Sequence, residues 1–152
     1  MNQTLRTPAL VCGLLLAGVS AFAMGRIVEP MPVSLQKLAD IEYEAGDEIP
    51  DEILAYDGEE VEISGYMRNG TTEGETWFDL TNDACGCGTS KLQHFVRVTL
   101  EEGSTSFTPD ELVLTGRFEV SEKEDEDGFV ESIYRLEIKS LDDEAGPAPS
   151  VN

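Results

Sequence analysis

The sequence is poor in basic residues, histidine and tryptophan. Its 152 residues include ten Lys and Arg against 31 Asp and Glu, one His and one Trp, and the formal net charge is −21. A charge of this size repels phosphate backbones, so the composition excludes DNA and RNA as partners. Because the acidic residues are spread along the whole chain, we interpret them as a solvated surface and not as one acidic binding face.

The chain also lacks the residue patterns of common enzyme sites. A Ser-His-Asp arrangement could be built only on His94, and there is no Gly-x-Ser-x-Gly motif. No glycine-rich loop of the kind that binds nucleotide phosphates is present. We therefore expect no enzyme activity and assign no catalytic residue.

Long apolar runs are absent after the first 23 residues. Residues 1–23 combine one positive charge at Arg6, an apolar core from about Ala9 to Val19, and the small-residue ending Ala21-Phe22-Ala23. This layout is typical of a secretory signal peptide with an Ala-x-Ala cleavage site. The core is short for a membrane span, which needs roughly 20 residues, although an uncleaved anchor is the alternative. We expect a mature protein that begins near Met24, has no transmembrane segment, and is periplasmic or otherwise exported.

The rest of the sequence predicts a lead-in, one β domain and a tail. Residues 24–58 are the lead-in, with a short helix at about 34–45 that Ser34 caps. Residues 59–141 contain five segments in which apolar and polar residues alternate, a pattern typical of half-buried strands. Residues 142–152 predict a disordered acidic tail.

Two glycines favour a barrel for the β domain. The first and fourth expected strands contain VEISGYM and LVLTGRF, which place Gly65 and Gly116 on the inward face at mid-strand. Glycine in such a position often marks a sharp bend at a barrel corner. We therefore expect a mainly all-β fold, namely a five-stranded OB-like barrel with a short N-terminal helix.

The stretch NDACGCGTSKLQHF, residues 82–95, contains Cys85, Cys87 and His94. Thiolates with an imidazole suit Zn(II) or Cu(I), so these three residues are the candidate metal ligands, and Asp79 or Asp83 could complete the set. The donor count is low, because structural zinc sites usually have four Cys or His ligands. Two alternatives remain: a local disulfide between Cys85 and Cys87, or a glycine turn in which the thiols only pack.

Several segments together resemble a known family. LQKLADIEYE, IPDEILAYDGEEVEISGYM, the Cys-Gly-Cys-Gly turn, ELVLTGRFEV and GFVESIYRLE follow the order found in an exported bacterial domain-of-unknown-function family, number 3299. The resemblance covers nearly all of the mature chain, but family members usually resemble CCFG where this chain has Cys85-Gly86-Cys87-Gly88. It implies a periplasmic or envelope protein with an OB-like core, in loose company with transport systems for metals or other cargo. It implies no established activity.

The sequence thus predicts an exported, acidic, OB-like binding or accessory module of the cell envelope. Its expected role is metal handling, of Zn or Cu, through Cys85, Cys87 and His94. The alternative is a structural or partner-docking envelope protein with a local disulfide and no metal, and a thiol-redox protein is the third hypothesis. The expected partners are a metal ion or an envelope or transport protein.

Overall fold

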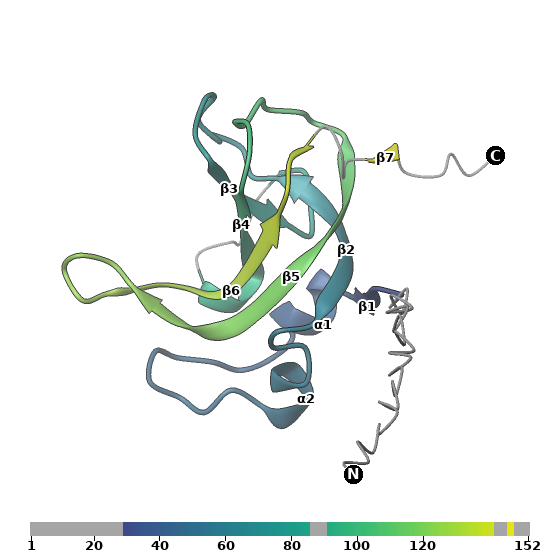
Figure 1. The fold of residues 1–152 in the computed structure, drawn as a ribbon. Helices are drawn as coiled ribbons and strands as arrows, with labels where there is room; N and C mark the ends of the chain where they lie inside the picture. The colour runs from purple at the N-terminus through teal and green to yellow at the C-terminus, as the bar shows by residue number, and fades with distance from the viewer. Residues whose placement is uncertain (1–28, 86–90, 142–145, 148–152) are drawn as a thin grey trace, which may run out of the picture.

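The computed structural model of the protein describes residues 29–85, 91–141 and 146–147 (Figure 1). The expected signal peptide, Cys87 and most of the expected tail lie outside the described residues. Within the described part of the chain, no helix is long and apolar enough to cross a membrane.

The protein is mainly β, as the alternating pattern predicts, and its strands form one mixed sheet. The strands are β1 (Met31–Val33), β2 (Glu60–Met67), β3 (Trp77–Thr81), β4 (Phe95–Leu100), β5 (Glu111–Glu124), β6 (Val130–Ile138) and β7 (Gly146–Pro147). The helices are α1 (Leu35–Ala39), α2 (Asp51–Leu54) and the 3₁₀ turn η1 (Leu92–His94).

The pairings of β2 to β6 run around a closed ring. β2 pairs with β3, β3 with β4, β4 with β6, β6 with β5, and β5 with β2. All of these pairs are antiparallel except β4 and β6, which are parallel. Each strand in this ring therefore has a neighbour on both sides along at least part of its length.

The sheet has seven strands in the described residues, two more than the five that the sequence predicts. The two additional strands are short: β1 has three residues and β7 has two. β1 pairs with residues 61–63 of β2, where β3 does not reach because it pairs with β2 only at Tyr66 and Met67. Such short strands form where a longer strand has an unpaired edge, and local sequence patterns do not show where such an edge is available.

Helix α1 is shorter than the sequence predicts. It ends at Ala39 instead of near residue 45, and the backbone N–H of the C-cap residue Asp40 donates to Gln36. The predicted cap is confirmed, since the Ser34 hydroxyl accepts a hydrogen bond of 3.4 Å from the Lys37 N–H. Ile41, which continues the helical spacing in the sequence, packs against the core from a loop.

The inward-facing residues of the strands form the core, together with apolar residues of the lead-in. The predicted inward face of β5 is confirmed by the burial of Leu112, Leu114, Phe118 and Val120. Leu38 of α1 and Ile53 of α2 are fully buried in the same cluster. The two short helices therefore contribute directly to the core of the sheet.

Gly65 and Gly116 occupy positions where no side chain fits, as their place in the expected strands suggests. A Cβ atom at Gly65 would lie 2.8 Å from the carbonyl oxygen of Thr81. A Cβ at Gly116 would collide with the carbonyl oxygen of Glu137 on β6. Both glycines allow neighbouring strands to approach closely, which is a recognised reason for glycine within a strand.

Strands β5 and β6 continue as a hairpin beyond the rest of the sheet, and the loop between α1 and α2 lies next to it (Figure 1). Glu122 of β5 joins the two segments. Its carboxylate accepts a hydrogen bond from the Tyr43 hydroxyl and one of 2.6 Å from the Gly46 N–H. Burial and the bond to Glu122 raise the pKa of Tyr43 to about 12, and the bonds from Tyr43 and Gly46 lower the pKa of Glu122.

This contact predicts a pH-dependent contribution of Glu122 to stability. Because the pKa of Glu122 is lower in the folded state, its contribution is present above the ordinary Glu pKa of about 4.3 and is lost as the pH falls through the folded value. We expect Glu122→Gln to lower the melting temperature at neutral pH and to have little effect in acid. Thermal unfolding followed by circular dichroism, from neutral pH down to about pH 3, measures this difference.

Glu124→Gln is the matched control, since it removes an exposed carboxylate from the same hairpin. If the melting temperatures of the Glu122→Gln and Glu124→Gln variants depended on pH in the same way, the assigned role of Glu122 would be contradicted.

Candidate functional site

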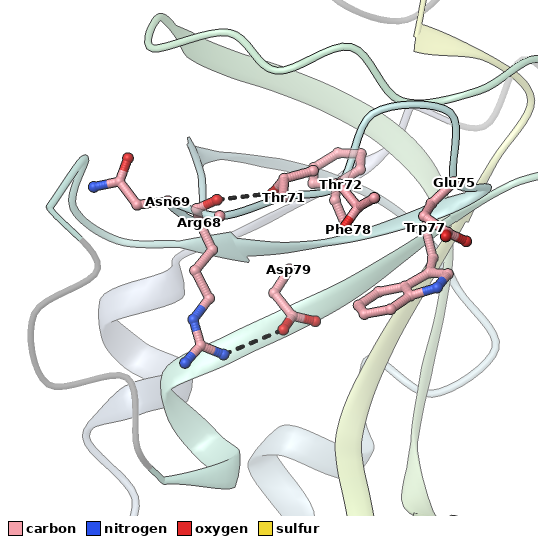
Figure 2. A pocket seen from close by; sticks show the side chains of 9 residues that line it. Arg68, Asn69, Thr71, Thr72, Glu75, Trp77, Phe78 and Asp79 are labelled. Carbon is pink, nitrogen blue, oxygen red and sulfur yellow. Dashed lines mark hydrogen bonds and ion pairs between the residues drawn. The ribbon is translucent and has the colours of Figure 1, made fainter.

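The candidate site lies where β2 and β3 separate (Figure 2). The Arg68 N–H donates to the Asp79 carbonyl over 2.9 Å, and the chain then leaves β2 and forms the loop 69–76, which leads into β3. Gly70 and Gly74 have φ angles of +91° and +85°, which glycine adopts without a steric penalty. The two strands are therefore no longer paired beyond this point.

Hydrogen bonds to the connection between β4 and β5 fix the position of the loop 69–76. The Thr105 hydroxyl donates to the Thr72 carbonyl over 2.6 Å, and the Gly74 N–H donates to the Thr105 carbonyl over 3.0 Å. A groove of about 290 Å³ remains between the loop and β3, lined by residues 68–72, Glu75 and residues 77–79. We call it the β2–β3 groove.

Asp79 is the central charged residue of the groove, and its side chain is nearly buried. Arg97 of β4 contacts one carboxylate oxygen through Nε at 3.1 Å, and Arg68 contacts the other through Nη1 at 3.4 Å. Arg97 also donates from Nη1 to Glu131 over 2.9 Å. Figure 2 shows the Arg68 side chain extended towards Asp79. Ion pairs of this kind compensate the cost of burying the carboxylate.

Trp77, the only tryptophan of the chain, lies on the same strand face as Asp79, because residues two apart on a strand share a face. The Arg97 guanidinium lies 4.4 Å from the centroid of the indole ring, a distance typical of a cation–π contact. Trp77 nevertheless remains 42% exposed. The groove thus presents an aromatic surface whose position an arginine fixes.

The cysteine turn begins beside this groove. The Asn69 side-chain amide donates to the carbonyl oxygens of Ala84 and Cys85 over 3.2 and 3.4 Å. The Cys85 sulfur belongs to a disulfide bond, and neither Cys12 nor Cys87 lies within the described residues. Among residues 29–85, 91–141 and 146–147, no group of three or more His, Cys, Asp or Glu is placed to hold a metal ion. Metal binding by Cys85, Cys87 and His94 stays a prediction, and it applies only to the reduced protein, because the metal ligand is a thiolate and not a disulfide sulfur.

His94 lies in a different setting from the one expected. The sequence suggests a strand beginning near Lys91, but the structure has η1 there, and His94 is its last residue before β4. His94 lines a hollow of about 510 Å³ together with lead-in residues such as Ile41, Tyr43 and Asp47. Lys91 and Gln93, from the same segment as His94, complete the lining.

Asp79 is a poor candidate to complete a metal site. From the sequence, Asp79 is a possible additional metal ligand. In the structure, both of its carboxylate oxygens contact guanidinium groups, and its side chain is 8% exposed. A metal ion would have to displace two arginines from this carboxylate. Sequence reasoning gave no functional role to Arg68, Trp77 or Arg97. The contact between Asp79 and Arg97 depends on the register of β3 against β4, which the sequence alone does not reveal.

No family model matches the chain, and no curated protein matches it. Among solved structures, the crystal structure of a DUF3299 family protein from Pseudomonas aeruginosa PAO1 is similar to this chain. The two sequences are 18% identical, the match covers 72% of this chain and 93% of that chain, and the TM-score is 0.48. The family of that protein is the one that the sequence resembles.

Proposed function

We propose that the protein is an exported, non-enzymatic binding module of the cell envelope, and that its ligand site is the β2–β3 groove. The signal-peptide pattern of residues 1–23 supports export. The closed ring of pairings supports an OB-type barrel made of β2 to β6. The ligand is then a molecule or a protein segment found outside the cytoplasm.

The position of the groove supports this proposal. OB-type barrels bind their ligands on the face of the second and third strands and at the loop that joins the first two strands. In this chain those strands are β3 and β4, which carry Trp77 and Arg97, and that loop is 69–76. The observation that supports the proposal most strongly is the exposed Trp77 side chain next to a nearly buried ion-pair network.

Fluorescence of Trp77 tests the proposal, because no other tryptophan contributes to the emission. The probes are the N-acetyl derivatives of the common amino acids except tryptophan and tyrosine, which absorb and emit themselves, as free acids and as amides, added to protein recovered after its own export. We expect at least one probe to shift the emission in a saturable way, because a ligand in the groove removes water from the indole.

The variant Thr72→Phe serves to fill the groove, since Thr72 lines it and is held to Thr105 only through its main-chain carbonyl. We expect this variant to lose the response. Ser106→Phe adds the same ring at an exposed position outside the groove lining and is expected to keep it. Absence of a saturable response to every probe at millimolar concentration would refute the groove as a ligand site.

A further inference from the structure

We propose that the β2–β3 groove takes a ligand that carries one carboxylate next to a flat apolar group. The carboxylate binds Arg68 and the apolar group lies on Trp77. This inference rests on the proposed function and adds the chemistry of the ligand to it. Four properties of the groove support it: the exposure of Arg68, the local charge balance, the position of Glu75 and the size of the groove.

Arg68 is available to a ligand. Its side chain is 43% exposed, and it pairs with Asp79 through a single contact of 3.4 Å from Nη1. Asp79 has a closer partner in Arg97, at 3.1 Å. A guanidinium carries five N–H donors in a planar fork that matches the two oxygens of a carboxylate. Arg68 can therefore bind a second carboxylate without leaving Asp79 unpaired.

The local charge balance favours one additional negative charge. Three cationic side chains, Arg68, Arg97 and Lys123, are joined by ion pairs to two carboxylates, Asp79 and Glu131. Among these ion-paired groups, three positive charges against two negative charges leave one positive charge; Glu75 lines the groove as well but belongs to none of these four ion pairs. The whole chain has a formal net charge of −21, so this cluster differs in sign from the rest of the molecule. One ligand carboxylate would complete its pairing.

Glu75 limits the ligand to a single negative charge. Its side chain lines the groove next to Trp77, while Arg68 lies on the other side of Asp79 in the same view (Figure 2). A second anionic group near Trp77 would meet the Glu75 carboxylate and would be repelled by it. A monocarboxylate therefore fits this groove, whereas a phosphate chain or another polyanion does not.

The size of the groove limits the apolar part to one residue. Its volume of about 290 Å³ is at the lower end of the range for small-molecule pockets, roughly 300–1,000 Å³. The Arg97 guanidinium covers one face of the Trp77 ring, and the exposed remainder of the indole can stack on a planar group. An N-acylated aromatic amino acid, or the C-terminal residue of a peptide, has this size and charge.

The test compares N-acetyl-phenylalanine with N-acetyl-phenylalanine amide, which differ in the carboxylate alone. Binding is followed by Trp77 emission, because phenylalanine does not absorb where tryptophan is excited. We expect the acid to bind about tenfold more tightly than the amide, as a charge-assisted hydrogen bond predicts. In Arg68→Gln we expect this preference to disappear while the amide binds as before.

Arg117→Gln is the matched control, because it removes the same charge from an exposed position on β5 and is expected to keep the preference. N-acetyl-Gly-Gly-phenylalanine identifies the source of the carboxylate. Tighter binding of this peptide points to a peptide C-terminus, and equal binding points to a small free acid. Equal binding of the acid and the amide to the wild-type protein would overturn the inference while leaving the groove as a ligand site. No binding of either would also overturn the inference, whereas the proposed function is refuted only if every N-acetyl amino acid of the series fails to bind.

Discussion

Replacing Gly116 with alanine is expected to destabilise the protein by roughly 2–3 kcal/mol, and replacing it with valine is expected to prevent folding. The new Cβ would collide with the carbonyl oxygen of Glu137 and would lie 2.8 Å from Cγ2 of Ile138. The carbonyl belongs to the β5–β6 pair, in which Arg117 is opposite Glu137, so it cannot move without disturbing the ladder. This cost exceeds the gain of about 0.4–1 kcal/mol that alanine brings by restricting the unfolded chain.

Urea unfolding, followed by Trp77 fluorescence and by circular dichroism, measures the effect. Ser64→Ala is the control, because it changes an exposed position on β2 and is expected to alter the free energy of unfolding by less than about 0.5 kcal/mol. The loss of unfolding free energy in Gly65→Ala is expected to lie between those of Gly116→Ala and Ser64→Ala, because one of the closest neighbours of Gly65 is the flexible end of Leu35. A Gly116→Ala variant as stable as Ser64→Ala would show that β5 and β6 are not this close.

Replacing Asp79 with alanine is expected to cost about 3 kcal/mol, since removing one partner of a nearly buried ion pair leaves the other charge uncompensated. Arg97, whose side chain is 15% exposed, would keep only Glu131, and Arg68 would lose its partner. The loss also removes the contact that orients Arg97 above Trp77, so the emission of the folded protein is expected to change. The free energy of unfolding in urea gives the first effect, and the emission spectrum without urea gives the second.

Asp83→Ala is the matched control for this prediction. Asp83 is exposed, and it accepts the hydrogen bond from the Thr81 hydroxyl through its main-chain carbonyl, which alanine keeps. If Asp79→Ala and Asp83→Ala had the same stability and the same emission, Asp79 would not be the centre of the charged network.

The strands and their inward faces could be predicted because alternation is a local property of the sequence. The segment ELVLTGRFEV shows which residues of β5 are buried, and the glycine within it marks a close approach of β6. The end of α1 at Ala39 could not be predicted in this way. Ile41 has helical spacing, but it reaches the core from a loop.

The groove could not be predicted, because it depends on the register between strands far apart in the sequence. Asp79 and Arg97 are paired across β3 and β4, and no local sequence pattern near either residue predicts this pairing. The position of Trp77 in ETWFDLT is equally consistent with a core residue, and only its 42% exposure in the structure shows that it lies at the surface. The cysteine turn attracted attention because its chemistry is visible in the sequence. The described part of that turn borders the groove through Asn69.

The central claim, that the β2–β3 groove is the ligand site, is tested most directly by two-dimensional ¹H–¹⁵N NMR of the exported protein titrated with N-acetyl-phenylalanine. We predict that the amide and indole signals of residues 68–79, and those of Arg97 in the facing strand, shift progressively and saturate together. The signals of the hollow beside His94 and of the β5–β6 hairpin are predicted to stay in place. Shifts centred on either of those regions, or no shifts at saturating ligand, would contradict the claim.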